Sequence, residues 1–249
     1  MIAALPFYDP PVYRDLTDAL WTAAASRLAD RGIEAPATLT RSADLEADYA
    51  RADLLVSQCC GHPWLEGAGK GTALIGAQAL ICDGGGAGRY RSAVVRRRED
   101  SRDLEDLRIA INSECSVSGW LSLRRFMEVE GVTARPHLVT GAHLHSVAAV
   151  REGRADLAAI DCVYWHIARA QGWDAGLEHI GWTESVPSPP YITSLNTSPF
   201  VRESVRLALS DAMRDPTMAA YRAAFGIADV VKAAPDAYEL YRGWQQQAA

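Results

Sequence analysis

Two patterns of apolar residues alternate along this chain, one typical of helices and the other of strands. A spacing near 3.6 between apolar residues predicts a helix over 12–30, where Leu16, Leu20 and Leu28 share one face. Short apolar runs flanked by polar and glycine residues predict strands, and in the first part of the chain these cover 2–5, 37–40, 53–57, 72–81 and 90–96. Residues 45–50 predict a short helix, and 61–71 and 83–88 predict loops.

The same alternation continues in the second part of the chain. Strands are predicted at 107–112, 135–139, 155–160, 178–183 and 191–195, and helices at 118–130, 143–151 and 163–170. Beyond Pro199 the pattern predicts only helix, with a break at Pro216. Strands that alternate with helices predict an α/β fold, with parallel sheets covered by helices on both faces. The length suits two lobes of about 100 residues each.

Composition narrows the class of protein. The chain has 249 residues, of which 49% are hydrophobic and 22% charged, as in ordinary globular proteins. No apolar run reaches the roughly 18 residues that span a bilayer, so we expect no membrane insertion. The net charge of −6 argues against nucleic acid as a partner, but it does not exclude a local site for a small anion.

The cysteines and the N-terminus bear on the compartment. Five cysteines without a CxxC pair predict buried, reduced thiols rather than a disulfide framework. The apolar run 1–5 is short and follows no basic segment, unlike a signal peptide. As the sequence stands, we therefore expect a cytoplasmic protein. A periplasmic location is expected instead if Met1 replaces a removed signal peptide.

Three segments resemble cofactor-binding or metal-binding motifs but lack the residue order or spacing that those motifs require. Residues 67–72 contain Gly-Lys, but the order of residues differs from that of a phosphate-binding loop. The glycines of 84–88 lack dinucleotide-binding spacing and lead into a strand. His143 and His145 have no further cysteine or histidine at ligand spacing. We expect neither a cofactor nor a bound metal.

A helix start offers the clearest chemistry. The strand at 107–112 leads to Ser116-Val117-Ser118-Gly119, where the next helix begins. The first N–H groups of a helix lack partners within it, and together with two hydroxyls they form a site suited to a tetrahedral anion. The alternative is an ordinary serine cap, which contributes about 1 kcal/mol to helix stability.

Two further segments follow this helix start in a fixed order. Thr140-Gly141-Ala142-His143 begins the next helix, and the segment from Ala148 to Asp161 follows it. This combination resembles the phosphate/phosphonate-type substrate-binding proteins of ABC transporters. The match is strongest from Arg108 to Asp161, and a weaker one extends over most of the chain.

The resemblance implies a two-lobed fold of the type II periplasmic-binding-protein class. In such a fold two crossing segments join the lobes, and a small anionic ligand binds in the cleft between them. One lobe is expected to comprise 1–92 plus 191–249, and the other 93–190. The implied partners are the ligand and, if the protein is exported, an ABC-transporter permease.

The resemblance also implies which residues bind the ligand. Ser116, the Val117 N–H and Ser118 would hold the anion, with His143 as a further donor. Val117 stands where the family often has Thr or Ser. The other candidates, each with a structural role as the alternative, are Tyr8, Ser57, Gln58, Cys59 and Tyr90.

Asp161 carries information about the ligand. A carboxylate only accepts hydrogen bonds, so against an anion it requires a protonated oxygen or a ligand ammonium. That would favour phosphate, phosphite or an aminophosphonate over sulfate. The alternative is that Asp161 caps the helix that follows it.

Two other functions stay open. The chain could be a cytoplasmic enzyme on the same fold, similar to chorismate dehydratases of menaquinone pathways or to pyrimidine-synthesis enzymes of thiamine pathways. Its reactive groups would then be Cys59, Cys60 and His62, whose alternative is burial in the core. The third hypothesis is the effector domain of a regulator, but no helix-turn-helix precedes the first strand.

Overall fold

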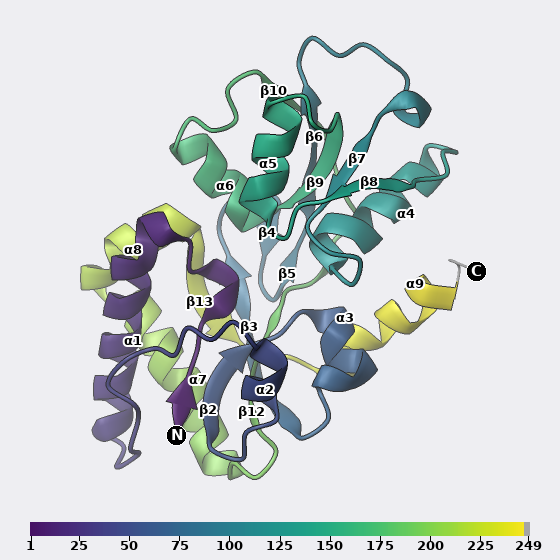
Figure 1. Ribbon diagram of the computed structural model, residues 1–249. Coiled ribbons are helices and arrows are strands. Elements are labelled where there is room, and N and C mark those ends of the chain that lie inside the picture. The colour runs from purple at the N-terminus through teal and green to yellow at the C-terminus, as the bar shows by residue number, and fades with distance from the viewer. Residues whose placement is uncertain (247–249) are drawn as a thin grey trace. The chain divides into compact units, whose positions relative to one another are not determined.

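The computed structural model describes residues 1–246 (Figure 1). The chain forms two compact units. Unit 1 comprises 1–81, 86–89 and 187 onward, and unit 2 comprises 82–85 and 90–186. Each unit has its own five-stranded sheet, and the predicted α/β class is confirmed.

The sheet of unit 1 has the order β1-β2-β12-β3-β13. Its strands are β1 (Ile2–Ala3), β2 (Leu54–Gln58), β12 (Pro190–Ser194), β3 (Thr72–Leu80) and β13 (Ile227–Val231). β1 and β2 are parallel, whereas β12 is antiparallel to both β2 and β3, and β13 is antiparallel to β3. The predicted all-parallel arrangement is therefore wrong here, because the chain returns to this sheet from unit 2 in the opposite direction.

Helices of unit 1 pack on this sheet and on one another. α1 (Arg14–Ala29) packs against α7 (Pro199–Arg214), and α7 contacts β13 and β3 (Figure 1). The remaining helices are α2 (Leu45–Tyr49), α3 (Gly61–Pro63), α8 (Ala219–Phe225) and α9 (Arg242–Gln246). Short helical turns cover Pro6–Tyr8 (η1), Pro11–Tyr13 (η2), Trp64–Ala68 (η3), Pro216–Met218 (η6) and Pro235–Tyr241 (η7).

Three further expectations for unit 1 are wrong. Residues 37–40 form no strand, although the Thr40 N–H donates to the Ala3 carbonyl. The loop predicted at 61–71 contains α3 and η3. The all-helical end of the chain contains β13, because Gly226 takes a left-handed conformation (φ 63°) that ends α8 and turns the chain toward β3.

Unit 2 has the sheet order β10-β6-β9-β7-β8. These strands are β10 (Leu177–Trp182), β6 (Ser92–Arg97), β9 (Leu157–Asp161), β7 (Ile109–Ile111) and β8 (Pro136–Val139). β7 runs parallel to β8 and β9, and β6 is antiparallel to both β9 and β10. This sheet is therefore also mixed rather than all-parallel.

Alternation along β9 divides the core of unit 2 into two layers. Leu157 and Ala159 pack with Leu123 and Met127 of α4 (Ser122–Val129). Ala158 and Ile160 pack in a second cluster with residues of α5 (His143–Arg151) and α6 (Cys162–Ala170). Since successive side chains of a strand point to opposite faces, helices cover both faces of this sheet, as predicted.

Three two-residue strands form a separate small sheet of order β11-β5-β4. They are β11 (Val186–Pro187), β5 (Arg89–Tyr90) and β4 (Gly85–Gly86). Three of the four points at which the chain passes between the two units lie within these strands, and the fourth lies between Ile81 and Cys82. Two further helical turns belong to unit 2, η4 (Leu104–Asp106) and η5 (Val117–Leu121).

Candidate functional site

One edge of the unit 2 sheet collects the polar residues that the sequence singled out. The parallel strands β7 and β9 end at this edge, and the antiparallel strand β6 begins there, with Ser92 opposite Asp161. The segment after β7 leads into η5 and α4, and η5 packs on β9. Carboxyl ends of strands in α/β sheets are the usual place for ligands.

The start of η5 is a wide, buried helical turn. The Gly119 N–H donates to Ser116 Oγ at 3.1 Å, and the N–H groups of Trp120 and Leu121 both donate to the Ser116 carbonyl. The first N–H groups, those of Val117 and Ser118, lie where a helix provides no internal partner. Both the cap and the anion-binding geometry that the sequence predicted are thus compatible with this turn.

Gly119 makes this turn sterically possible. A Cβ at this position would lie 1.8 Å from Oδ1 of Asn112, which follows β7. No other residue type fits without moving the Asn112 side chain or the backbone. The turn therefore packs directly against the Asn112 side chain at the end of β7.

Ser118 connects this turn to a second helix start. Ser118 Oγ lies 2.8 Å from His143 Nε2 and 3.4 Å from Ser116 Oγ. His143 is the first residue of α5, and the preceding turn is held by Thr140 Oγ1, which lies 2.7 Å from Ser146 Oγ. The structure thus brings together the two helix starts that the sequence identified 25 residues apart.

The network is buried and carries no formal positive charge at neutral pH. Ser116, Ser118 and His143 are each less than a tenth exposed. Burial lowers the pKa of His143 to about 4, against a smaller opposing effect of the Ala159 carbonyl. His143 is therefore neutral at pH 7, and an anion here would meet hydroxyls, backbone N–H groups and an uncharged imidazole.

Asp161 has the capping role that the sequence left open. Its Oδ1 accepts a hydrogen bond of 2.8 Å from the Val163 N–H at the start of α6, and its side chain is buried. This contact fixes the carboxylate at the same sheet edge as the serines. It neither requires nor excludes a second role toward a ligand.

Ser92 is a residue that the sequence analysis missed. It lies opposite Asp161 in the sheet, it is 1% exposed, and its Oγ has no hydrogen-bond partner within residues 1–246. Tyr90, two residues earlier at the end of β5, is also buried. The position of Ser92, two residues after Tyr90 on the crossing strand, was the only signal in the sequence.

The other predicted ligand residues form a group of their own in unit 1. Tyr8 ends η1, while Ser57 and Gln58 end β2, and Cys59 follows; all four are buried. Gln58 Oε1 accepts from the Phe7 N–H at 3.1 Å, and its carbonyl accepts from Tyr49 Oη at 2.8 Å. The Gln58 side chain therefore ties the segment after β1 to the end of β2.

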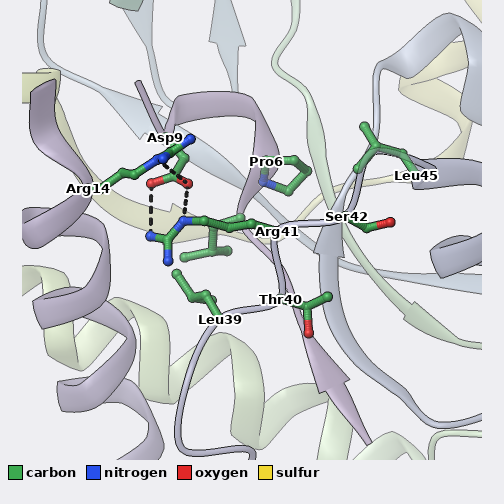
Figure 2. A pocket seen from close by; sticks show the side chains of 9 residues that line it. Pro6, Asp9, Arg14, Leu39, Thr40, Arg41, Ser42 and Leu45 are labelled. Carbon is green, nitrogen blue, oxygen red and sulfur yellow. Dashed lines mark hydrogen bonds and ion pairs between the residues drawn. The ribbon is translucent and has the colours of Figure 1, made fainter. Parts of the chain in front are cut away.

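A charged cavity of about 210 Å³ lies beside the segment that follows β1. Figure 2 shows Arg14 and Arg41 directed at Asp9; Arg41 Nε lies 2.6 Å from the Asp9 carboxylate, and Arg41 also contacts Asp18 at 2.9 Å. These ion pairs raise the pKa of Arg41 above its ordinary value. The sequence analysis missed these residues, and their charges compensate one another.

The residues proposed for an enzyme lie at the end of β2 and the start of α3. Cys59 and His62 are buried, and Cys60 is half-buried. Among residues 1–246, no three His, Cys, Asp or Glu side chains are placed to hold a metal ion. No helix in this part of the chain is long and apolar enough to cross a membrane.

Comparison with known proteins identifies the family. The profile of the family described as "ABC transporter, phosphonate, periplasmic substrate-binding protein" matches residues 2–238. The chain belongs to this family. The resemblance seen in the sequence is thereby confirmed, and membership implies a small ligand and a transporter permease as partners.

Solved structures share the fold of this phosphonate-family binding protein at low sequence identity. PhnD1 from Prochlorococcus marinus in complex with methylphosphonate has a TM-score of 0.75 and 15% identity, over 99% of this chain and 97% of that chain. The binding protein component of an ABC phosphonate transporter from Pseudomonas aeruginosa has a TM-score of 0.72 and 13% identity, over 98% and 85%.

A third structure of the same fold was solved with a nucleotide. XAC2383 from Xanthomonas citri bound to ATP has a TM-score of 0.69 and 18% identity, over 99% of this chain and 97% of that chain. A search of curated protein sequences found no match to the phosphonate-family chain. These likenesses support the two-lobed α/β fold, and the individual ligand residues stay predictions.

Proposed function

We propose that this protein binds a small phosphorus oxyanion, a phosphonate or phosphate, as the solute-binding component of an ABC transporter. The observation that carries the proposal is the buried network in which Ser116, Ser118 and His143 meet at a helix start. The methylphosphonate in the PhnD1 relative supports this ligand class. Periplasmic action alongside a membrane permease follows from the family and is part of the proposal.

The geometry suits an anion because its donors are already assembled. The N–H groups of Val117 and Ser118 start η5, and the two hydroxyls lie beside them. A hydrogen bond to a charged group contributes about 1.5–3 kcal/mol, so four of them supply roughly 6–12 kcal/mol before ordering costs. A micromolar complex requires about 8.2 kcal/mol.

Asp161 gives the proposal its ligand selectivity. Its Oδ1 accepts a hydrogen bond from the Val163 N–H, which fixes the carboxylate beside Ser92, the first residue of β6. A carboxylate in this place favours a ligand that carries a proton or an ammonium group, and disfavours sulfate. We therefore expect phosphonates, phosphite and phosphate to bind more tightly than sulfate.

The remaining ligand residues of the proposal are tested separately from the helix start. Tyr8, Ser57, Gln58 and Cys59 belong to unit 1, and Tyr90 to unit 2. Variants Tyr8→Phe, Ser57→Ala and Tyr90→Phe remove one hydroxyl each. A loss of affinity in any of them adds that residue to the site, and unchanged affinity assigns it a structural role.

The deciding experiment is calorimetric titration together with thermal unfolding. Methylphosphonate, aminoethylphosphonate, phosphite, phosphate and sulfate are titrated into the wild type and into a Ser116→Ala/Ser118→Ala double variant. A ligand at about 100 times its Kd adds roughly 2.7 kcal/mol, which raises Tm by about 5–10 °C at this size. We expect this rise with a phosphorus oxyanion in the wild type and its loss in the double variant.

Ser198→Ala is the matched control. Ser198 caps α7 in unit 1 by accepting from the Val201 N–H at 3.3 Å, so its removal costs a serine cap without touching the Ser116 network. This variant should lose about 1 kcal/mol of stability and keep the full ligand response. A ligand response that survives in the double variant would refute the proposed site.

A further inference from the structure

Two thiols meet in unit 2 beside the proposed anion site. Cys82 Sγ lies 3.7 Å from Cys162 Sγ, and both side chains are buried. Cys82 is the first residue of the turn 82–85, and Cys162 is the first residue of α6, directly after Asp161. Both residues belong to the same compact unit, so their contact does not depend on how the two units are placed.

Backbone hydrogen bonds hold the two cysteines in place. The Gly85 N–H donates to the Cys82 carbonyl, and the Arg91 N–H donates to the Gly84 carbonyl, both at 2.9 Å. The Cys162 N–H in turn donates to the Arg91 carbonyl at 3.2 Å. Arg91 therefore connects the turn to the start of α6 through its main chain.

Side chains hold the same turn from two other directions. Arg169 of α6 lies 3.1 Å from Asp83. Gly84 has φ +83°, and a Cβ on it would lie 2.3 Å from the ring of Trp182. The turn is thus fixed to the rest of unit 2 by contacts that do not involve the thiols. The short Sγ–Sγ distance is therefore a property of the scaffold.

We propose that Cys82 and Cys162 form a disulfide when the protein meets an oxidising thiol–disulfide environment. A disulfide needs its sulfur atoms about 2.0 Å apart, so the two must approach by about 1.7 Å. Side-chain rotation can supply an approach of this size while the backbone contacts stay in place. The five cysteines would then comprise one bonded pair and three thiols, Cys59, Cys60 and Cys115.

The oxidant in this step is a second disulfide, such as oxidised glutathione. Cys82 is the more exposed of the pair (9% against 0%), so its thiolate attacks first and releases one glutathione thiolate. The Cys162 thiolate then attacks the Cys82 sulfur and releases the second glutathione. The protein loses two protons and two electrons, and oxidised glutathione becomes two thiols.

The second attack is expected to be slow at neutral pH. Contact with Cys82, burial and the charge of the neighbouring Asp161 carboxylate raise the pKa of Cys162 well above its ordinary value, so its reactive thiolate is scarce. The closing of the disulfide should therefore accelerate as pH rises from 7 to 9. Cys115, by contrast, is exposed, and its Sγ lies 3.5 Å from Ser113 Oγ rather than beside another thiol.

The disulfide would enclose the proposed anion site within one covalent loop. The chain between the two cysteines contains Ser92, Ser116, Ser118, His143 and Asp161. Closing a loop of this length restricts the unfolded chain strongly. We expect Tm of the oxidised protein to exceed that of the reduced protein by several degrees, whether or not an anion binds.

The test uses the full chain in which Cys59, Cys60 and Cys115 are replaced by Ala. This variant is reduced, treated with oxidised glutathione, alkylated and digested without reductant. We expect a peptide pair joined through Cys82 and Cys162, no alkylated thiol, and a rise in Tm. Further replacement of Cys82 or Cys162 by Ala should abolish that rise. The same peptide pair is expected from the wild-type chain, which keeps the test valid if a variant does not fold.

Three results would overturn the proposal. One is a glutathione adduct on Cys82 that persists without closing on Cys162. The second is a disulfide between two chains, and the third is complete alkylation after oxidation at pH 9. None of these results depends on anion binding, so the outcome is separate from that of the proposed function.

Discussion

The strand β9 has an aspartate at each end, and the two have different surroundings. Asp156, just before the strand, contacts Arg97 at 2.6 Å, Arg102 at 3.0 Å and Arg108 at 2.8 Å. Asp161, at the other end, caps α6 near two serines and a neutral histidine. One end of the sheet holds a carboxylate that three arginines neutralise, while at the other end the carboxylate of Asp161 lies near uncharged donors.

This contrast separates polar groups that stabilise the fold from polar groups that are available to a ligand. Arginines at the Asp156 end neutralise a buried charge that belongs to the protein. Uncharged donors at the Asp161 end leave room for a charge that a ligand brings. The following changes test this interpretation, in order of decreasing expected effect.

Asp156→Asn should cost the most stability. Removing one partner of a buried ion-pair cluster typically costs about 3–5 kcal/mol, and here it leaves three arginines without their shared carboxylate. Urea unfolding measures the loss. The ligand-induced rise in Tm should be unchanged, and a variant that loses ligand binding as well would show that the two ends of β9 are coupled.

The same substitution should change the acid response. Arg108, with Arg97 and Arg102, holds the pKa of the Asp156 carboxyl well below its usual range. Because the folded-state pKa is depressed, this stability is present above the unfolded value near 4 and is lost as pH falls below it. The Asn variant should show a flatter loss of stability below about pH 4.

His143 predicts a pH dependence from the other end of the sheet. Its folded-state pKa of about 4 is below the unfolded value near 6.5, so the unfolded chain takes up the proton first. Stability should therefore fall as pH decreases through this window, by about 1.6 kcal/mol between pH 6.5 and 5. His143→Gln should flatten the curve there, and a wild-type curve that is already flat would contradict the buried neutral imidazole.

Asp161→Asn should change selectivity more than stability. The Asn oxygen can still cap α6, so the free energy of unfolding should change by less than about 0.5 kcal/mol. Repulsion of an unprotonated anion disappears, and sulfate should gain about tenfold in affinity relative to methylphosphonate, or roughly 1.4 kcal/mol. Calorimetry with both ligands measures the ratio, and an unchanged ratio would leave Asp161 as a cap alone.

Arg102→Gln should have the smallest effect. Arg102 is well exposed, and without it Asp100 still pairs with Arg97 while Asp156 keeps its contacts with Arg97 and Arg108. Exposed ion pairs contribute little to stability, so the urea midpoint of this variant should shift least among the variants of this series. A larger loss would mean that all three arginines are needed at this end of the sheet.

Short-range patterns predicted most of the elements. The helix at His143–Arg151 has the predicted bounds, and β3 (Thr72–Leu80) differs by one residue from the prediction. The errors occur where a strand depends on a distant partner. β13 forms because it pairs with β3, some 150 residues earlier, and 37–40 fails because Thr40 makes only one bond to the β1 segment.

The sequence showed only those parts of the candidate site that are local patterns. Two helix starts with serine, glycine and histidine are local patterns, and the sequence showed them. The 2.8 Å contact between Ser118 and His143 depends on how β7, β8 and β9 pair, which no local pattern contains. Ser92 and the Cys82–Cys162 pair were missed because a single serine, and two cysteines 80 residues apart, form no motif.

The position of β12 in unit 1 affects the order of folding during synthesis. β12 lies between β2 and β3, yet the ribosome makes it more than 100 residues after β3. The stretch 90–186 emerges before β12 and contains every strand of the five-stranded sheet of unit 2. Unit 2 can therefore fold before β12 is available to pair with β2 and β3. Unit 1, although its first residues are made earliest, completes its sheet last.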